Sequence, residues 1–361
     1  MAVPQPIFNA DNFTLNPQEV QFISEAIFDY VLQYSELQEH HEIVTGLQWA
    51  QQIAIIGQLG LAGVKREDCR VGKNLSGIPL SEKFWYPTLI GDRYEICTVT
   101  DYDAMLKLFG KYNRVNPDFF NWVDSPQMKV VLGRVLEAFM AAMQRLVWFG
   151  DTRADTVANS GYLTNGTDPA FFTPFDGFWA QIFNEIAANR HVIITENTDV
   201  TYAKQQDLPT DFSFNLFRDM WAYADPRFKQ AAANRTITPV IHCTSAIAEN
   251  WVNYRESQSL AFTLQNAESG GFRDIFRNIK IVPRYDWDSI IQTYFDNGTT
   301  WNLPNRALLA SKENLQVGTL STSDFGKLDA FYDKYHGLNV IDWNIMLDAK
   351  IPLMDMVVVA Y

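Results

Sequence analysis

Two stretches of the chain decide its fold: KFWYPTLIGDRYEICTVT, residues 83–100, and IDWNIMLDAKIPLMDMVVVAY, residues 341–361. Both are rich in β-branched and aromatic residues, which is typical of strands. A Gly91–Asp92 dipeptide predicts a turn that breaks the first stretch. The second stretch predicts two strands joined near residues 349–350, as a hairpin that ends the chain. Neither carries catalytic residue types in a useful arrangement, so both are expected to build sheets rather than a reaction centre.

The composition is compatible with a large hydrophobic core and argues against direct binding of nucleic acid. The chain has 361 residues, 47% of them hydrophobic and 14% aromatic, enough for one large domain or two smaller ones. High aromatic content is typical of heavily packed cores and of extensive interfaces. The formal net charge of −13 repels phosphate backbones, so we expect no DNA binding through a basic patch. A negative wall could still enclose DNA without gripping it.

Cysteine usage and the terminal stretch exclude several other classes of protein. The three cysteines, at positions 69, 97 and 243, are widely spaced and form no C-x-x-C pair, so neither a zinc knuckle nor a disulfide framework is indicated. MAVPQPIFNADNF, residues 1–13, lacks the basic and apolar regions of a signal peptide. No apolar stretch has the length of a membrane span.

The strongest helical pattern covers residues 126–149. Ser125 can cap this helix and Pro126 suits its first position, while Gly150 ends it. The apolar residues recur at helical spacing: Val131, Leu132, Val135, Leu136, Phe139, Met143, Leu146 and Val147. At about 1.5 Å per residue the helix would span roughly 36 Å, which suits a support for other elements. A second helix is expected to begin at Asn16, after an extended arm.

Residues 43–100 predict a long hairpin-like excursion. Two extended arms, near residues 51–56 and 84–100, flank a glycine-rich stretch that carries charged side chains. Two interpretations of the cationic cluster Lys65, Arg66 and Arg70 stay open: a solvated loop tip, or a contact with acidic surface on a neighbouring subunit. The aromatic triplet on the returning strand could anchor the same contact: Phe84, Trp85 and Tyr86.

Helical and strand patterns alternate over residues 171–325, which predicts a compact α/β region. The expected helices and strands are helices near 178–186, 211–224, 245–254 and 286–295, and strands near 191–195, 237–243, 279–283 and 306–311. The final strand must be tied down to be ordered, and we expect it to pair near the long helix.

Metal-ligating residue types occur, but in unfavourable patterns. His242 and Cys243 would point to opposite faces of a strand, which favours a core cysteine beside a hydrogen-bonded histidine. Residues 40–42 read His-His-Glu, and neighbours on a helix diverge by about 100°, which favours a solvated helix end. Asp101 with Asp103, and Asp286 with Asp288, match a short metal-binding pattern of sugar transferases, but Asp286 suits a helix N-cap. We therefore expect no catalytic residue, no cofactor and no metal.

The order of elements resembles that of the major capsid proteins of tailed bacteriophages, the Hong Kong 97-type fold. Similarity is strongest in residues 43–65, 83–100, 145–152, 176–182 and the C-terminal hairpin, and these segments look like capsid proteins of phages that infect Bacteroidetes. The resemblance implies an α+β chain with four parts: an N-terminal arm, 1–42; an extended E-loop, 43–100; a peripheral domain, 101–172 plus 325–361, with spine helix 126–149; and an axial domain, 173–324.

The same resemblance implies a structural function. Such proteins form pentamers and hexamers that close into an icosahedral shell around double-stranded DNA, without sequence-specific DNA binding and without a membrane. A separate scaffolding protein, a portal and decoration proteins are the expected partners, with assembly in the cytoplasm of the host bacterium and a final place in the virion. Some relatives cross-link lysine to asparagine, and Lys65, Lys73 and Lys83 lie in the corresponding region, but no acceptor is identified and no cross-link is assigned.

Two alternatives remain open. An encapsulin-type compartment shares the fold but encloses enzymes, and such shells are usually built from shorter chains. A small-molecule or sugar-active enzyme would use aromatic residues and carboxylates such as Asp101 or Asp286.

Overall fold

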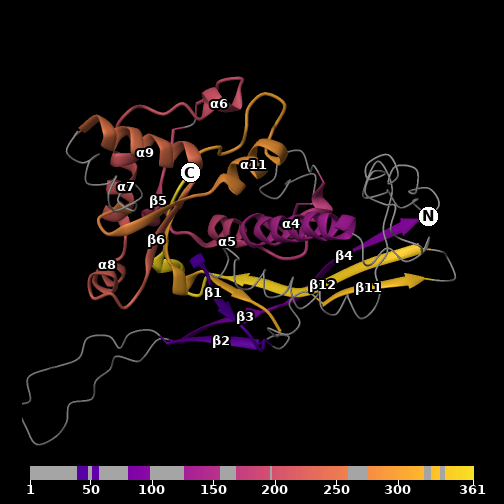
Figure 1. The fold of residues 1–361 in the computed structure, drawn as a ribbon. Coiled ribbons are helices and arrows are strands. Elements are labelled where there is room, and N and C mark those ends of the chain that lie inside the picture. Colours follow the sequence, from indigo (N-terminus) through magenta and orange to yellow (C-terminus); the bar gives the residue numbers. More distant parts are fainter. Residues whose placement is uncertain are drawn as a thin grey trace, which may run out of the picture.

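Two sheets and a separate two-stranded ribbon organise the chain (Figure 1). The computed structural model describes residues 39–47, 51–56, 80–97, 126–154, 168–195, 197–258, 275–320, 327–333 and 338–361. The helix expected from Asn16, the glycine-rich tip and the Asp101–Asp103 pair lie outside these residues. Both helices and strands are abundant in the described part, as the α+β prediction requires.

The first sheet is built around one long strand, β12 (Leu338–Lys350). β4 (Thr88–Cys97) pairs with it antiparallel from Leu347↔Thr88 to Leu338↔Cys97. The remaining strands are β11 (Lys327–Asp333) and β10 (Gln316–Gly318), both antiparallel to β12, and β1 (Glu42–Val44), parallel to β10. The two stretches quoted first above therefore lie side by side although some 240 residues separate them, as the register Gly91↔Asn344 shows.

The turn expected at Gly91–Asp92 is wrong. β4 runs straight through both residues, which pair with Asn344 and Trp343. The glycine is explained by a close approach instead, because a Cβ atom there would lie 2.5 Å from the main-chain oxygen of Trp343. The break between strands falls earlier, at Tyr86–Pro87, between β3 (Leu80–Trp85) and β4.

The second sheet has the order β5-β13-β9-β6-β8-β7. Its strands are β5 (His191–Val192), β13 (Val358–Ala360), β9 (Ala307–Ser311), β6 (Pro239–Cys243), β8 (Ile279–Pro283) and β7 (Ile275–Phe276). Both of its faces are buried. Along β9, Ala307 and Leu309 belong to one hydrophobic cluster, and Leu308 and Ala310 to the other, as the alternation of side chains along a strand dictates.

Helices cover the two faces of this sheet separately. One face is covered by helices α7 (Phe212–Tyr223) and α9 (Ser245–Gln258), which bury Phe217 and Trp251. The other is covered by α4 (Pro126–Phe149), α5 (Phe178–Glu185) and α11 (Tyr285–Tyr294). Two short helices, α6 (Tyr202–Gln205) and α8 (Pro226–Ala233), complete the described set with the 3-10 turns η1 (Pro169–Phe171), η2 (Ala188–Arg190), η3 (Lys312–Asn314) and η4 (Met354–Met356).

The long helix α4 is confirmed at its predicted bounds. Its C-terminal half lies at the centre of the hydrophobic cluster that also contains Leu308 and Ala310 of β9. There, Trp148 packs against Trp287 with ring centroids 4.7 Å apart. Trp179 of α5 lies 5.2 Å from the same Trp287 ring. Because this cluster touches both sheets, it joins them into one body. No helix in the described ranges is long and apolar enough to cross a membrane.

The C-terminal hairpin expected from the sequence is wrong. β12 belongs to the first sheet, whereas β13 pairs with β9 and β5 in the second. The link between them is tied down by Ile351 and Val357, both fully buried. The last strand is thus ordered by pairing, as expected, but in the α/β region and not beside the long helix. β10 lies in the segment expected to form the axial domain, residues 173–324, but it pairs with β12 in the first sheet. The boundary expected at residue 324 therefore does not separate the two sheets.

Candidate functional site

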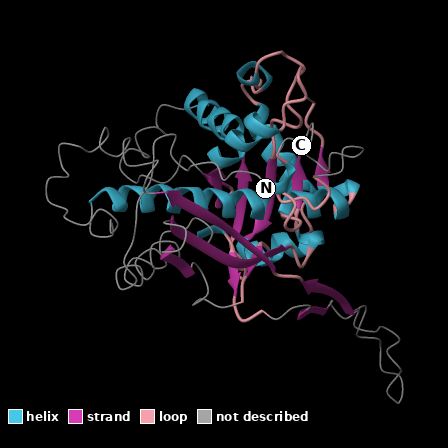
Figure 2. Ribbon diagram, turned by 90° about the vertical axis from the view of Figure 1, so that its right-hand side faces the viewer, coloured by secondary structure: helices cyan, strands magenta, loops and turns pink. Residues whose placement is uncertain are grey.

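Among the described strands, those of the β2–β3 ribbon join neither of the two larger sheets. β2 (Gln51–Ile56) and β3 (Leu80–Trp85) pair antiparallel, from Gln51↔Trp85 to Ile56↔Leu80, and with no other described strand. This confirms the hairpin-like excursion at its base. Figures 1 and 2 show the ribbon at one side of the molecule, apart from both sheets. A two-stranded ribbon has little stability by itself, so its base and its contacts decide where it points.

The base of the ribbon is anchored by Trp85. Its side chain is only 2% exposed and lies against Gly318 of β10. A Cβ atom at Gly318 would lie 2.6 Å from the nearest Trp85 ring atom and 2.2 Å from Leu47, so glycine makes room for both side chains. The indole is therefore fixed in its own subunit.

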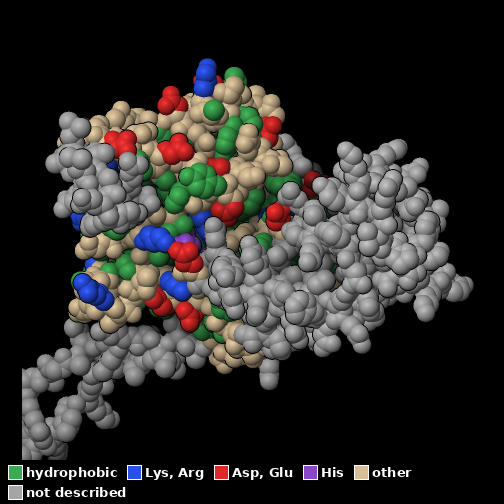
Figure 3. Space-filling view, in the orientation of Figure 1, with side chains coloured by type: hydrophobic (Ala, Val, Ile, Leu, Met, Phe, Trp, Pro, Cys, Tyr) green, Lys and Arg blue, Asp and Glu red, His purple; other side chains and the backbone are tan. Residues whose placement is uncertain are grey.

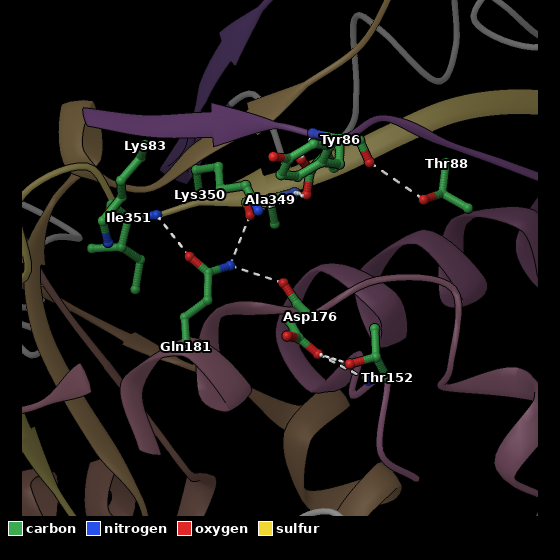
Figure 4. A network of polar contacts seen from close by, with 10 residues as sticks. Lys83, Tyr86, Thr88, Thr152, Asp176, Gln181, Ala349, Lys350 and Ile351 are labelled. Atoms are coloured by element: carbon green, nitrogen blue, oxygen red, sulfur yellow. Dashed lines mark hydrogen bonds and ion pairs between the residues drawn. The ribbon is translucent and has the colours of Figure 1, made fainter. Parts of the chain in front are cut away.

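Hydrogen bonds fix the same base to the end of β12 (Figure 4). The main-chain N–H of Tyr86 donates to Oδ2 of Asp348 at 2.7 Å. The ammonium of Lys83 donates to the main-chain oxygen of Ile351 at 2.8 Å and pairs with the carboxylate of Glu185 at 2.6 Å. Three elements distant in sequence thus meet where the ribbon leaves the body: β3, α5 and β12.

A buried amide continues this network inward. Gln181 of α5 is 7% exposed and donates to the main-chain oxygens of Ala349, at 2.7 Å, and Asp176, at 2.8 Å. Its Oε1 accepts from the N–H of Ile351 at 3.2 Å. Asp176 in turn accepts from the N–H and the hydroxyl of Thr152, both at 2.8 Å (Figure 4). The amide satisfies main-chain groups that β12 leaves unpaired as it ends, so the ribbon base rests on a rigid support.

Asp348 is the buried charge of the network. It is 1% exposed, and burial raises the pKa of its carboxyl, opposed by the ammonium of Lys350 and by the N–H groups of Tyr86 and Ala349. Lys350 lies 3.4 Å from it. Removing either partner would leave a buried charge without compensation, which is costly. We interpret the pair as a device that fixes the orientation of the ribbon.

Of the six residues predicted to contact neighbouring subunits, the structure describes Phe84, Trp85 and Tyr86. Lys65, Arg66 and Arg70 lie outside the described residues. Trp85 is buried in the core of its own subunit, whereas Phe84 is half-buried and Tyr86 is 48% exposed. The rings of Phe84 and Tyr86 lie 6.3 Å apart. Their contact with a neighbour stays a prediction, and the buried Trp85 is a support for it.

The solvated helix end expected at His40 and His41 is wrong. Their exposed fractions are 6% and 1%, because the chain turns inward before β1 begins at Glu42. The His41 ring stacks on Phe178 with centroids 5.5 Å apart and meets Trp148 edge-on at 5.2 Å. Both histidines are used to dock the segment that precedes the first sheet.

His242 completes this histidine cluster. It is fully buried, with ring centroids 5.6 Å from His40 and 6.0 Å from His41. The expected core cysteine is confirmed at Cys243, which is also fully buried. The hydrogen-bonded histidine is not, since neither ring nitrogen of His242 has a hydrogen-bond partner among the described residues. Burial, reinforced by the charge of Arg284, lowers the pKa of His242 well below its ordinary value, so the ring is neutral.

The aspartate pair of α11, Asp286 and Asp288, has a structural role. Asp286 was expected as the N-cap, but the helix begins at Tyr285 with Arg284 at the cap, which places Asp286 in the first turn. Oδ2 of Asp288 accepts from the N–H of Ser245 at 2.9 Å and so holds the start of α9. Within the described ranges, no group of three or more His, Cys, Asp or Glu side chains could hold a metal ion.

Sequence reasoning missed the supporting role of three residues at the ribbon base: Lys83, Gln181 and Asp348. None of them belongs to a motif, and the partners that tie together β3, α5 and the end of β12 lie 102 to 268 positions away in the chain. One signal was present, because Asp348 lies among apolar residues in a stretch that was expected to form strands. A charge at such a position indicates a specific partner.

Comparison with known proteins identifies the fold. No protein-family model and no curated protein matches the chain. Among solved structures, a chain of the capsid of the native GTA particle is 8% identical, with a TM-score of 0.52, and the match covers 99% of this chain and 94% of that chain. A capsid chain of cyanophage P-SCSP1u is 14% identical over 91% of this chain and 88% of that one, with a TM-score of 0.49. A chain of the satellite phage P4 procapsid, solved with the size determination (Sid) protein, is 12% identical over 94% and 98%, with a TM-score of 0.47. The likeness to the GTA capsid chain, from end to end of both, shows that this chain has the Hong Kong 97-type capsid fold.

Proposed function

We propose that this chain is the major capsid protein of a tailed phage, which assembles as pentamers and hexamers into an icosahedral shell around double-stranded DNA. One observation carries the proposal beyond the fold. The β2–β3 ribbon pairs with no other described strand, yet its base is fixed by a buried indole and a buried carboxylate. A ribbon with a rigid base and no further partner strand in the described part of its own subunit is suited to bind a neighbouring one.

The net negative charge of the chain favours a shell that encloses DNA without binding it tightly. The chain carries 42 acidic and 29 basic side chains. On the face shown in Figure 3, the described Lys and Arg side chains are interspersed with Asp and Glu and do not form a continuous basic surface. A shell of such subunits repels packaged DNA weakly and leaves it mobile.

Several finer assignments belong to this proposal. The division into an N-terminal arm, an E-loop, a peripheral domain and an axial domain is one of them, with β13 assigned to the axial domain. A separate scaffolding protein, a portal and decoration proteins are the other components of the particle. Assembly takes place in the cytoplasm of the host bacterium, and the mature protein resides in the virion.

The second candidate is an encapsulin-type compartment, favoured by the same fold. Its contents distinguish it from a phage capsid. Particles purified from producing cells are treated with nuclease and then analysed for protected DNA and for enclosed protein. Protected double-stranded DNA of uniform length supports the phage capsid, whereas an enclosed enzyme without DNA would replace it with the compartment.

A further inference from the structure

A cleft beside the long helix has the composition of a binding site. It measures 480 Å³ and lies between α4 and the strands β4 and β12, which Figure 1 shows running along that helix. Its lining is mostly apolar and includes Leu89, Ile90, Ala142, Phe171 and Trp343. Two of these side chains are strongly exposed, Leu89 at 62% and Phe171 at 54%. Large apolar side chains gathered at the mouth of a cleft indicate an interaction site.

Arg145 is the cation of this cleft. Its Nε donates to the main-chain oxygen of Phe171 at 3.2 Å, and its guanidinium lies 5.4 Å and 5.7 Å from the ring centroids of Phe171 and Phe172. Burial lowers the pKa of this guanidinium below its ordinary value. No carboxylate in the described part of the chain forms an ion pair with Arg145, so its partly desolvated charge is balanced by a main-chain oxygen and two aromatic rings and not by an opposite charge.

The acidic residue of the cleft does not fill that role. Asp92 lines the same cleft, but its Oδ1 accepts from the main-chain N–H of Arg93, and its charge acts on Tyr94, whose pKa is raised by burial first and by Asp92 second. The guanidinium therefore retains donors for an outside carboxylate, for which its planar fork is well suited.

We propose that this cleft, the Arg145 cleft, receives an acidic segment of a second copy of this chain, whose carboxylate pairs with Arg145 while an apolar side chain packs on Leu89 and Phe171. The occupant follows from charge complementarity. A chain with 42 acidic and 29 basic residues offers more carboxylates than cations, so a half-buried arginine that forms no ion pair with a described carboxylate is matched by the chain's own surface. The inference rests on the proposed function, which supplies copies at high local concentration.

The first test separates assembly from folding. Arg145→Met keeps the apolar stem and removes the charge. We expect assembly to weaken by at least about tenfold, because one partner of a desolvated pair is lost. The melting temperature of the isolated subunit should fall only a little, since Arg145 forms one side-chain hydrogen bond there and no ion pair with a described carboxylate. Arg145→Lys should restore part of the assembly. Arg218→Ala is the control, because Arg218 is an exposed arginine beside Asp219. A lower melting temperature with unchanged assembly would assign Arg145 to its own subunit and overturn the proposal.

The second test identifies the occupant. A photo-crosslinking amino acid replaces Leu89, particles are assembled from mixed isotope-labelled and unlabelled subunits, and the linked peptides are identified by mass spectrometry. We expect peptides of this chain that contain Asp or Glu and join the two isotopes. The same probe at Ile193, which is 78% exposed, is the control. Links to a different protein, or none in well-formed particles, would overturn the inference and leave the proposed function standing, whereas the absence of particles would overturn both.

Discussion

At the scale of single residues, the base of the ribbon is held by buried polar side chains rather than by apolar packing alone. Burial of a polar group costs free energy unless it is hydrogen-bonded, so such groups define one arrangement of the chain. Gln181 and Asp348 both satisfy main-chain N–H groups near the end of β12. Their contribution is to fix geometry where the ribbon begins.

Asp348→Ala should destabilise the subunit by about 3 kcal/mol, since it leaves Lys350 without its partner and Tyr86 without its acceptor. Asp348→Asn keeps an acceptor for the Tyr86 N–H and should cost less than the alanine variant. Denaturant unfolding of both variants beside the unsubstituted protein measures the difference. Equal stability of all three proteins would show that the carboxylate does not hold the ribbon.

Gly91→Ala should lower stability by about 1–3 kcal/mol, as overpacking does, because the new methyl group would collide with the main chain of β12. The nearest main-chain atom is the oxygen of Trp343, at 2.5 Å from the built Cβ. The melting temperature reports the loss, and Arg93→Ala in the same strand, with its exposed side chain, is the matched control. If Gly91→Ala melts with the control, the close pairing of β4 with β12 does not require glycine.

At the scale of elements, the spacing of apolar residues predicted the helices, because their bounds depend on local sequence. The bounds of α4, and those of α5, α7 and α9 to within a few residues, follow from apolar spacing and from capping residues such as Pro126. The pairing of distant strands could not be predicted in this way. The apolar sequence of β13 would suit pairing with β12 as well as with β9. Packing in the folded core decides that it pairs with β9. The burial of His40 and His41 likewise depends on Trp148 and Phe178, which no local pattern connects to them.

The histidine cluster should make stability depend on pH. Burial, then the charges of Arg284, Lys280 and Lys312, lowers the pKa of His40 to about 4, against the opposing charge of Glu39. The pKa in the folded state lies below that in the unfolded state, near 6.5, so the unfolded chain binds the proton first. Stability is therefore full above about pH 6.5 and is lost as the pH falls toward 4, by at most about 3 kcal/mol for this side chain.

Melting temperatures measured from pH 4 to pH 7 test this sign. The unsubstituted protein should lose stability steadily below about pH 6.5, and His40→Gln should show a smaller loss over the same range. Parallel curves for the two proteins would show that the docking of residues 39–44 through His40 does not carry the pH dependence.

Deletion of residues 57–80 should leave a soluble, folded subunit that does not assemble. The ribbon contributes no strand to either sheet, so both hydrophobic cores remain intact. Circular dichroism and thermal melting check the fold, and sedimentation checks assembly. Shells of normal size from this deletion would contradict the role assigned to the ribbon.

At the scale of the whole molecule, the order of elements along the chain predicted the fold better than any motif did. In the described part of the chain, the base of the excursion, the long helix and the α/β region follow one another, and the match to a capsid chain covers nearly all of both chains. The supporting contacts could not be predicted, because Lys83, Gln181 and Asp348 meet only after both sheets have formed. The contacts with neighbours that we propose for the ribbon and the Arg145 cleft depend on other copies of the chain, so the sequence of one chain does not predict them.

Electron microscopy of the untagged protein, purified from producing cells and examined over a range of concentrations, tests the central claim most directly. The predicted result is uniform icosahedral particles, or rings of five and six subunits, into which the fold fits with the ribbon reaching an adjacent subunit. A monodisperse monomer at every concentration, with neither rings nor particles, would contradict the assignment of this chain to a capsid shell.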